Sequence, residues 1–514
     1  MDVIHSLTLG DVLREHGRTR HSENALVCGE VRLTFAALNE RVNRLANGLR
    51  GCGVGEGARV LWLGQNCHRA LECLLAAAKL GAVFCPVNWR QSSEEIAFVI
   101  ADAEPAVVIW QEDEIGATIL RARELAGSSA VWLQHDSTGP GSYEEFLSVE
   151  AGDPPARVDS GLPLLQMYTA AFDGRPNGAL LSHTAILVQD LILALIEDLS
   201  SETVYLASGP LFHIWTFVHA TATFHLGGTI VVARRVDAPE LCRLIDKERC
   251  TAGFIMEPSR SQMVEANREG TYDLTSFRSL PGSAEWNAMV TMDTSPWATR
   301  PGLYGQTEVA ALVTTSALGG ILLGRHGRTS PMGLMRIVGD DGQEVPDGQV
   351  GELVCRGPTV MLGYHNRPEL NAQRQLDGWH HTNDLGRREA DGSITFIGPK
   401  TTMIKSAAEN IYPAEVEACI LLHPAVREVC IIGVPDPKWT QSVKALIALR
   451  DGHSATADEI IDHCRTRIAS YKKPRIVEFV TSLPRTPDGG VDRVGVDAAY
   501  GGGGYPGADA PPRS

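Results

Sequence analysis

Residues 168–183 form a stretch that could bind an anion through a turn of the backbone. Their sequence, YTAAFDGRPNGALLSH, follows an apolar run at 162–167 that predicts a strand. Gly174 and Gly178 predict a turn, and a helix-like run follows the pair Ser182 and His183. Strand, turn and helix in this order bring backbone N–H groups close to phosphate oxygens. A surface turn with two glycines is the plainer interpretation of this stretch taken alone.

The elements that must position this stretch alternate between helix and strand in the first half of the chain. Thr34 predicts a helix N-cap, apolar residues at helical spacing follow over 35–49, and Gly51 predicts the end of that helix. Residues 57–63, 81–87 and 105–110 predict short apolar strands, and 71–80 predicts a helix. Apolar strands separated by helices favour parallel sheets covered on both faces. We therefore expect an α/β fold.

The pattern of predicted secondary structure changes past about residue 320. Turn signals at 339–342 and 346–348 separate short strands and predict a small antiparallel β unit. Residues 403–498 again mix helix and strand, with predicted elements at 414–422, 429–434, 443–449, 457–468 and 476–480. The Gly/Pro-rich residues 501–514 predict a disordered tail.

Composition excludes several functional classes. The chain has 514 residues, enough for about three units, and a net charge of −16. An acidic chain without a basic block is a poor binder of nucleic acid or anionic lipid. No run of about 18 apolar residues predicts a membrane span, and the N-terminus carries no secretory pattern. Eleven cysteines lack metal or disulfide spacing, so we expect free thiols, no metal site and a cytoplasmic location.

The stretch at 168–183 resembles the phosphate loop of the adenylate-forming enzymes, which include acyl- and aryl-CoA ligases, nonribosomal adenylation domains and beetle luciferases. Their pattern is Y-T-S-G-T-T-G-x-P-K-G, often followed by S-H. Further motifs of that superfamily follow in order over about 450 residues. They are PLFH at 210–213, GSA at 282–284, LYGQTE at 303–308, TND at 382–384, a hinge-like segment at 398–417, GVPDPKW at 433–439 and YKKP at 471–474.

The resemblance implies a large N-terminal domain with parallel αβα sheets and a small β unit, joined to a small, mobile α+β domain. We expect the AMP- and acyl-binding domain at 1–398, a hinge at 399–402 centred on Thr402, the mobile domain at 403–500 and a tail at 501–514. In the superfamily the small domain rotates between an adenylating and a thioester-forming pose.

The resemblance also assigns roles to single residues. The nucleotide would be held by Gly282, Ser283, Ala284, Tyr304, Gly305, Thr307 and Asp384. In this set Tyr304 packs on adenine, Thr307 holds the phosphate and Asp384 holds the ribose hydroxyls. Glu308 serves the metal in complete enzymes, Lys405 resembles the lysine used in the thioester pose, and His213 stands near the pantetheine tunnel. His213 packed in the core, Lys405 in solvent and Asp384 in a turn remain the structural alternatives.

Several residues depart from the superfamily pattern at the phosphate. Ala170 and Ala171 replace Ser-Gly, Phe172 and Asp173 replace Thr-Thr, and Asn177 replaces lysine. Gly490 stands at the position of the adenylation lysine. Two lost cations and one added carboxylate change the local charge by three units beside a polyphosphate. One charge pair at about 4 Å is worth on the order of 4 kcal/mol, so we expect adenylation to be lost.

Other departures affect the tunnel and the acyl end. Pro399 replaces an arginine, Thr402 the hinge aspartate, and Ala407 and Ala408 stand where glycines line the pantetheine path. Trp215 and Phe217 could line the acyl pocket or belong to the core. The added methyl groups weaken the case for efficient thioester formation without excluding it.

We therefore expect an acid–thiol ligase that performs only the second half-reaction, in which acyl-AMP and CoA give acyl-CoA and AMP. Its substrates would be CoA and an adenylate from a separate upstream ligase, without a need for Mg²⁺. The split ligase pairs of bacterial diterpenoid antibiotic pathways such as platensimycin show the same division of labour. Two alternatives stay open, a complete ATP-dependent acyl-CoA ligase and a catalytically silent scaffold partner of an active ligase.

Overall fold

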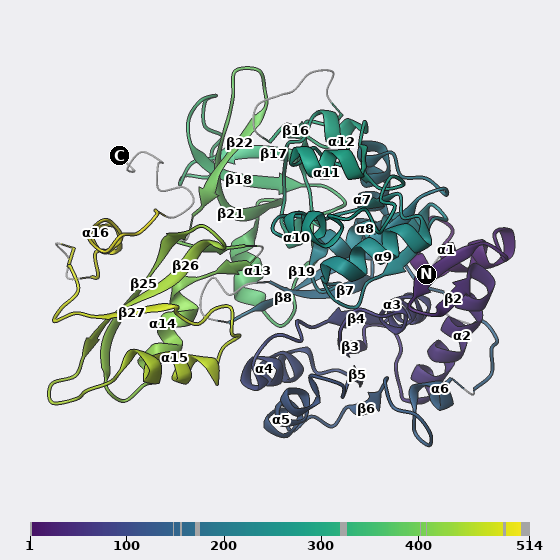
Figure 1. Ribbon diagram of the computed structural model, residues 1–514, viewed down its shortest axis with the longest axis horizontal. Helices are drawn as coiled ribbons and strands as arrows, with labels where there is room; N and C mark the ends of the chain where they lie inside the picture. Colours follow the sequence, from purple (N-terminus) through teal and green to yellow (C-terminus); the bar gives the residue numbers. More distant parts are fainter. Residues whose placement is uncertain are drawn as a thin grey trace.

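The chain folds into a large domain and a small domain, which Figure 1 shows side by side, the small one in yellow-green. The computed structural model describes residues 3–147, 149–154, 157–169, 175–318, 326–400, 402–407, 409–486 and 490–504. Within these residues, no helix is both long enough and apolar enough to cross a membrane.

Two main sheets build the large domain. The seven-stranded sheet has the order β19 (Gly363–Tyr364), β8 (Asn177–Ser182), β7 (Pro163–Thr169), β4 (Val83–Pro86), β3 (Arg59–Leu63), β5 (Val107–Trp110) and β6 (Val131–Gln134). The five-stranded sheet has the order β11 (Ala252–Gly253), β9 (Val204–Ala207), β10 (Thr229–Val232), β1 (Asn24–Cys28) and β2 (Val31–Thr34). From β7 to β6 the first sheet is parallel, as the short apolar strands predict.

Helices cover these sheets on both faces. They are α1 (Leu9–Thr19), α2 (Phe35–Gly51), α3 (His68–Leu80), α4 (Ser93–Ala103), α5 (Gly116–Ala126), α6 (Tyr143–Phe146), α7 (His183–Glu197), α8 (Ile214–His225), α9 (Ala238–Glu248), α10 (Ser259–Ala266), α11 (Ala284–Met289), α12 (Pro296–Thr299) and α13 (Pro368–Arg374). Strand β3 explains the layering, because side chains alternate along it. Val60 and Trp62 join the core under α3, whereas Leu61 and Leu63 join the core under α4 and α5.

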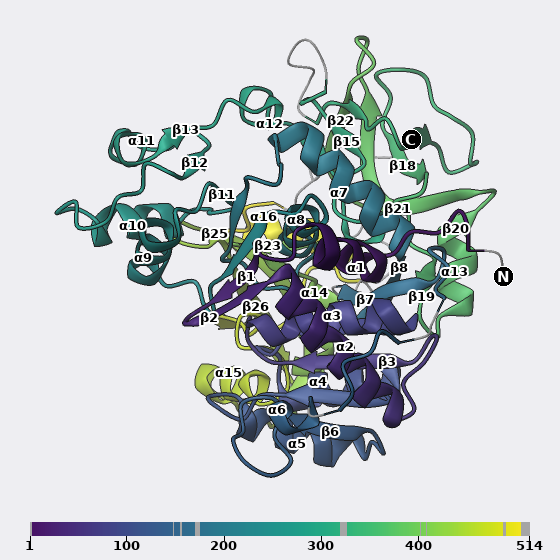
Figure 2. The same ribbon diagram turned by 90° about the vertical axis from the view of Figure 1, so that its right-hand side faces the viewer.

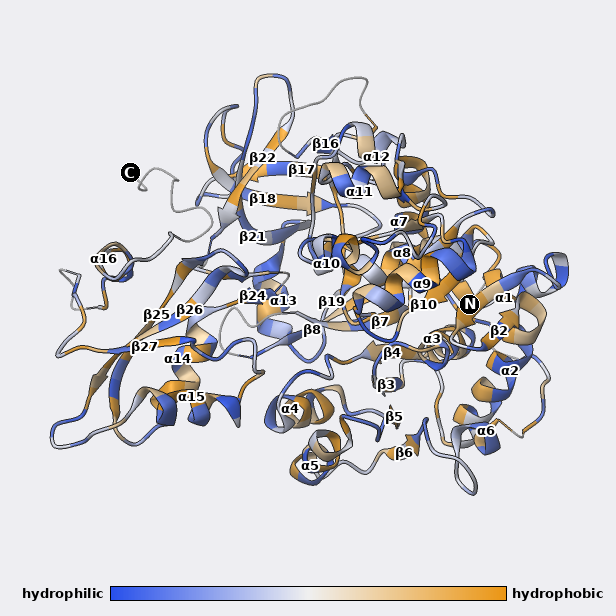
Figure 3. Cartoon of the chain, in the orientation of Figure 1, coloured by the Kyte–Doolittle hydropathy of each residue, from blue (hydrophilic) through white to orange (hydrophobic). Residues whose placement is uncertain are grey.

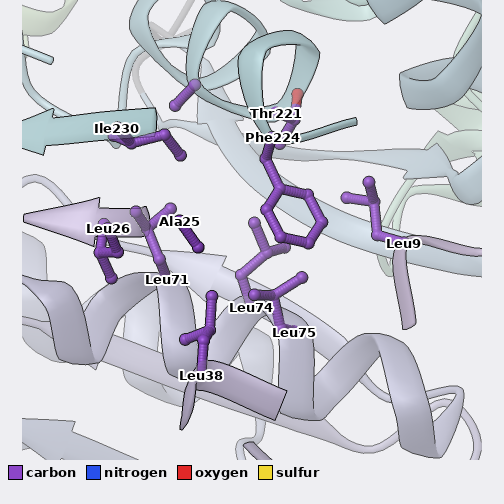
Figure 4. A pocket seen from close by; sticks show the side chains of 11 residues that line it. Leu9, Ala25, Leu26, Leu38, Leu71, Leu74, Leu75, Thr221, Phe224 and Ile230 are labelled. Atoms are coloured by element: carbon purple, nitrogen blue, oxygen red, sulfur yellow. The ribbon is translucent and has the colours of Figure 1, made fainter. Parts of the chain in front are cut away.

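Helices α1, α2 and α3 pack against one another, and Figure 2 shows them facing the viewer, on the side opposite the small domain. The predicted start of α2 is confirmed, since the Thr34 side chain accepts a hydrogen bond from the backbone N–H of Ala37. A small void between α3, α8 and β10 is lined almost wholly by apolar side chains, including Leu71, Leu75 and Phe224 (Figure 4). At about 10 Å³ it is a packing gap rather than a ligand site.

The predicted antiparallel β unit is also confirmed. Its sheet has the order β17 (Leu334–Val338), β18 (Gly351–Arg356), β21 (Trp379–Arg388) and β20 (Gln375–Leu376), with β22 (Ile394–Pro399) paired to β21. Smaller sheets join β14 (Leu303–Tyr304), β15 (Thr314–Thr315) and β16 (Arg328–Thr329), and also β12 (Arg278–Ser279) and β13 (Thr291–Met292). In Figure 3, β10 and β18 are coloured as hydrophobic, in keeping with their buried positions.

The order predicted for residues 168–183 is wrong in one respect. The turn is followed by strand β8, which pairs antiparallel with β7, and helix α7 begins only at His183. The sequence pattern misses β8 because Pro176 and Gly178 are turn formers, while the pairing partners of β8 lie elsewhere in the chain. No helix N-terminus therefore follows the turn directly.

The small domain contains β23 (Ile404–Ser406), β24 (Glu409–Ile411), β25 (Val426–Asp436), β26 (Thr440–Leu449) and β27 (Ile476–Phe479), with α14 (Pro413–Leu421), α15 (Ala457–Arg465) and α16 (Arg493–Ala499). The long antiparallel pair β25 and β26 forms its centre, and α14 packs against β25. Ile431, Ile447 and Val416 belong to its own buried core. A large α/β domain followed by a small α+β domain confirms the predicted fold class.

Candidate active site

Tyr304 and Asp384 meet at the junction of β14 and β21. The Tyr304 hydroxyl donates to Asp384 Oδ2 at 2.8 Å, and its ring stacks on Phe396 with centroids 5.3 Å apart. Gln306 Nε2 donates to the Tyr304 hydroxyl oxygen at 3.1 Å. Burial raises the pKa of Asp384 to about 7. Asp384 lies in a strand rather than a turn, and the structure brings it together with Tyr304 as a polar cluster that could hold a sugar hydroxyl.

Glu308 lies in the short helical turn η1 (Thr307–Val309), which follows this cluster directly. Its carboxylate is buried and accepts a hydrogen bond from the Tyr364 hydroxyl at 2.7 Å. Burial raises the pKa of Glu308. Gly305 makes the turn possible, because a Cβ there would lie 1.9 Å from the carbonyl oxygen of Ala311. Only glycine fits at such a close backbone approach.

Asn177 is buried at the start of β8, at the position where the superfamily has a lysine. Arg367 Nε donates to Asn177 Oδ1 at 3.0 Å, and Arg367 Nη2 forms an ion pair of 2.8 Å with Asp102 Oδ1. The Tyr168 hydroxyl donates to the second oxygen of Asp102 at 2.8 Å. The guanidinium beside Asn177 is thus neutralised by a buried carboxylate. Ala170, Ala171, Phe172 and Asp173 lie outside the described residues.

The hairpin of β23 and β24 docks the small domain onto the candidate site. Glu409 Oε1 forms an ion pair of 2.9 Å with Arg90 and lies 3.6 Å from His213 Nε2. Burial opposes ionisation of Glu409, but His213, Arg90 and Lys405 together lower its pKa. Lys405 Nζ donates to Asn410 Oδ1 at 2.7 Å, and burial lowers the pKa of Lys405. His213 is the N-cap of α8 and its side chain is partly exposed, so it is not a core histidine.

Position 490 belongs to the small domain but not to this hairpin. Gly490 contacts Thr486 through its carbonyl oxygen, in the loop that leads into α16. Figure 1 shows α16 at the outer edge of the small domain, well away from β7 and β8. The predicted hinge position, Thr402, lies two residues before the first residue of β23, and Ala407 adopts a left-handed φ of 51° at the tip of the hairpin. Ala408 lies outside the described residues.

A second ion-paired contact joins the domains through α4. Lys472, from the YKKP segment, is buried between Glu95 Oε1 of α4 at 2.7 Å and Glu415 Oε1 of α14 at 2.5 Å. The Ser92 hydroxyl, at the N-cap of α4, donates to the carbonyl oxygen of Arg467 at 2.8 Å. Burial of the Lys472 ammonium is offset by the two carboxylates, so its pKa is raised.

A pocket of about 400 Å³ opens beside α8, between β11, β12, α10 and α12. Its lining includes Phe254, Trp297 and the ion pair of the partly buried Glu197 with the buried His219. Trp215 borders it, with ring centroids 5.5 Å from Phe254 and 4.7 Å from His219. Phe217 instead packs on Phe84 and belongs to the core, as the alternative interpretation expects.

Residues 282–284 follow the lining residues of β12 and Leu280, with only Pro281 between. Ser283 caps α11 by accepting from the backbone N–H of Trp286, and the Gly282 N–H donates to Asn287 Oδ1 at 2.8 Å. Ala284 is the first residue of α11. All three positions are exposed, as positions that contact a ligand require.

Sequence reasoning missed four residues that shape the site, namely Gln306, Tyr364, Arg367 and Glu409. Gln306 and Glu409 occupy variable positions within recognised motifs. Their neighbours in those motifs could therefore have indicated that both residues lie at the site. Tyr364 and Arg367 contact partners 56 and 190 residues away. Contacts over such separations leave no local pattern in one sequence.

The geometry thus combines a buried polar cluster, a mixed polar and aromatic pocket, and a hairpin of the small domain that contacts Arg90 and His213 of the large domain. Such an arrangement suits a reaction in which a bound intermediate is passed to a second substrate, because the closed cleft positions the reacting groups and excludes water. Among the described residues, no group of three or more histidine, cysteine or acidic side chains is arranged to hold a metal ion.

Comparisons with known proteins agree with this architecture. A feruloyl-CoA synthase from Amycolatopsis sp is 36% identical over 484 residues, which cover 92% of this chain and 95% of that protein. An indoleacetate–CoA ligase from Aromatoleum aromaticum is 33% identical, over 94% of this chain and 96% of that protein. The solved structure of the amide bond synthetase McbA from Marinactinospora thermotolerans covers 96% of this chain and 100% of its own, with a TM-score of 0.81 and 26% identity.

Two family profiles match in the same order as the two domains. The AMP-binding enzyme profile matches residues 13–365, and the AMP-binding enzyme C-terminal domain profile matches residues 415–489. The chain therefore belongs to the AMP-binding enzyme family.

Proposed function

We propose that the protein is an acid–thiol ligase that forms acyl-CoA from an acyl-adenylate and CoA, with adenylation from ATP lost or very weak. In this reaction the CoA thiolate attacks the acyl carbonyl carbon, a C–S bond forms, and the bond to the phosphate oxygen breaks to release AMP. The observation that carries the proposal is the docked hairpin, which holds Glu409 near His213 and carries Lys405 on its first strand, while α16, the helix that follows position 490, lies at the outer edge of the small domain. The proposed thioester step needs no group from position 490.

The surroundings of Asn177 support the same proposal. The ammonium of a superfamily lysine would face the phosphates of ATP, whereas here an amide occupies that position. Arg367 contacts the amide, but Asp102 pairs with the guanidinium, so the pair carries no net charge toward a polyphosphate. Phosphoryl chemistry depends on electrostatic stabilisation, and an acyl-adenylate already lacks the pyrophosphate that needs it.

For the thioester step we assign roles to the side chains at the cleft. Asp384 would hold the ribose, Tyr304 would pack on adenine, Thr307 would hold the phosphate of AMP, and Lys405 would approach that phosphate as it leaves. His213 would stand at the mouth of the tunnel, oriented by Glu409. Thr402 would act as the hinge. We further propose a cytoplasmic enzyme of natural-product biosynthesis that receives its adenylate from a separate ligase.

A complete ATP-dependent acyl-CoA ligase is the second candidate. The names of the aligned relatives favour it, because a feruloyl-CoA synthase and an indoleacetate–CoA ligase match over more than 90% of the chain. In that case rotation of the small domain would have to bring another cation to the phosphates. Lys400, which pairs with Glu352 at 3.2 Å, is one cation near the hinge.

One pair of assays separates these candidates. Purified protein is given synthetic acyl-adenylate with CoA but no ATP, and separately acid with ATP, Mg²⁺ and labelled pyrophosphate. We expect acyl-CoA in the first assay and background exchange in the second. Exchange at a rate typical of ligases would establish the complete enzyme instead. No turnover in either assay, with stable co-purification of another ligase, would establish a scaffold.

Reconstruction of the lost residues gives an independent test. A variant with Asn177→Lys, Gly490→Lys and the Ser-Gly-Thr-Thr sequence at 170–173 should regain adenylation. Asn177→Lys alone should not, because position 490 would still lack the adenylation lysine and residues 170–173 would still lack the Ser-Gly-Thr-Thr sequence. Full recovery by the single variant would contradict the charge argument.

A further inference from the structure

The pocket beside α8 has the position and length of an acyl site. His213 caps the N-terminus of α8 at the docked hairpin, and His219 lies six residues further along the same helix. Six residues of helix span about 9 Å, roughly one aromatic ring and a short linker to its carboxyl group. A ligand that reaches from the reaction centre to His219 therefore has the dimensions of a small aryl acid.

The walls of this pocket favour a flat ring over an alkyl chain. Phe254 and Trp297 line it, and Trp215 lies against both, with centroid separations of 5.5 Å and 6.2 Å. Aromatic rings at such separations stack with or meet the edge of a further ring. The lining also includes charged groups, among them Arg260, Arg278 and Asp293, which a long alkyl chain would strip of water without compensation.

The distant end of the pocket holds an ion pair between the buried His219 and the partly buried Glu197. His219 Nε2 lies 2.8 Å from Glu197 Oε1, and His219 Nδ1 lies 2.6 Å from the carbonyl oxygen of Trp215. A backbone carbonyl and an ionised carboxylate both accept hydrogen bonds, so this geometry favours a proton on each ring nitrogen and the imidazolium form of His219. Burial opposes this charge, but Glu197 raises the pKa of His219 above its ordinary value.

This arrangement determines what the pocket can offer a ligand. Both N–H groups of His219 are already used, which leaves the imidazolium no proton for a ligand. Glu197 accepts from His219 through Oε1, and its Oε2 has no hydrogen bond to any described residue. A carboxylate oxygen accepts and does not donate. The polar end therefore favours a substituent that donates a hydrogen bond over one that only accepts.

We propose that this pocket selects aryl acids whose ring carries a hydrogen-bond donor, a hydroxyl or an amino group, which Glu197 receives. The proposal rests on the proposed function, since it takes the pocket as the acyl site of the ligase. Glu197 is then a specificity residue, and His219 is a positioning residue that holds the carboxylate. Acids with an unsubstituted ring would displace water from Glu197 Oε2 without giving it a hydrogen bond, and would bind less tightly.

The test measures binding by calorimetry with unreactive adenylate analogues in which a sulfamate replaces the phosphate. The probes carry a 3-(4-hydroxyphenyl)propanoyl or a 3-phenylpropanoyl group and differ only by the hydroxyl. We expect the hydroxylated probe to bind the full-length protein about 10-fold to 100-fold more tightly. Equal affinities would overturn the proposal.

The double variant Glu197→Leu/His219→Leu replaces the whole pair by apolar side chains, which avoids an unpaired buried charge. We expect its preference for the hydroxylated probe to vanish or reverse, while the unsubstituted probe still binds. The matched control Glu202→Leu/His453→Leu changes an exposed glutamate and an exposed histidine and should keep the preference. A preference that survives in the pocket variant would also overturn the proposal.

Turnover separates this inference from the proposed function. If the protein binds the hydroxylated probe preferentially through Glu197 but does not convert acyl-adenylate and CoA, the proposed specificity stands and the proposed thioester activity is refuted. Conversion of both adenylates at equal rates would retain the activity and refute the specificity.

Discussion

Asp384 should make the protein less stable at alkaline pH, and Asp384→Asn should remove this effect. The carboxyl is held in β21, and burial raises its pKa from 3.8 to about 7. Nearby carboxylates of Glu308 and Glu352 raise the pKa further, while the hydrogen bond from Tyr304 lowers it. Asparagine keeps the shape of the side chain and cannot ionise, so the variant isolates the charge.

The sign follows from proton counting. Between pH 3.8 and about 7 the folded chain keeps on Asp384 a proton that the unfolded chain has lost. The free energy of unfolding therefore falls as pH rises through this window and levels off above it. A pKa difference of about three units, at about 1.4 kcal/mol each, corresponds to a total loss of about 4 kcal/mol. About 2.5 kcal/mol of that loss falls between pH 5 and pH 8.

Urea unfolding followed by tryptophan fluorescence measures this difference. At pH 8 we expect Asp384→Asn to unfold at a clearly higher urea concentration than the unmodified protein, and at pH 5 the gap should narrow by about 2.5 kcal/mol. Asp347→Asn, in an exposed turn between β17 and β18, serves as the control and should shift neither curve. The same gain at both pH values, or none, would refute the assignment of a raised pKa to a buried Asp384.

Three further predictions concern the turn, the hairpin and the domain contact. Ala407→Gly should raise the free energy of unfolding by about 0.5–1 kcal/mol, because Ala407 holds a φ of 51°; a lower melting temperature would contradict this. Gly305→Ala should lower it by about 3 kcal/mol or more, since its Cβ would collide with the Ala311 carbonyl; unchanged thermal unfolding would show that the turn adapts. Arg90→Ala and Glu409→Ala should be coupled by about 1 kcal/mol in the thioester rate, and strict additivity in a double-mutant cycle would mean that their ion pair does not hold the hairpin.

Local patterns in the sequence predict the elements of this fold well. Thr34 with its following apolar spacing predicts α2, and the turn signals at 339–342 predict the loop after β17. These signals succeed because capping and turn formation involve residues only a few positions apart. Strand β8 fails for the opposite reason, since its start carries turn residues and pairing with β7 and β19 decides its conformation.

Individual site residues can be predicted from the sequence only where they belong to a recognised motif. Tyr304 and Asp384 were both expected at the nucleotide, and they form one hydrogen-bonded cluster. The pairing of Arg367 with Asp102 could not be foreseen, because the two residues are distant in sequence and neither belongs to a recognised motif. The Glu197–His219 pair is similar, because it depends on how α7 packs against α8.

The buried Lys472 has a consequence for any turning of the small domain. Glu415 travels with Lys472 in the same domain, whereas Glu95 stays behind on α4. When the small domain rotates, the Lys472 ammonium thus keeps its ion pair with Glu415, and only its contact with Glu95 is replaced by water. The contact between the domains can therefore break and re-form without leaving Lys472 buried and unpaired. It can favour one docked position of the small domain while adding little to the barrier for undocking.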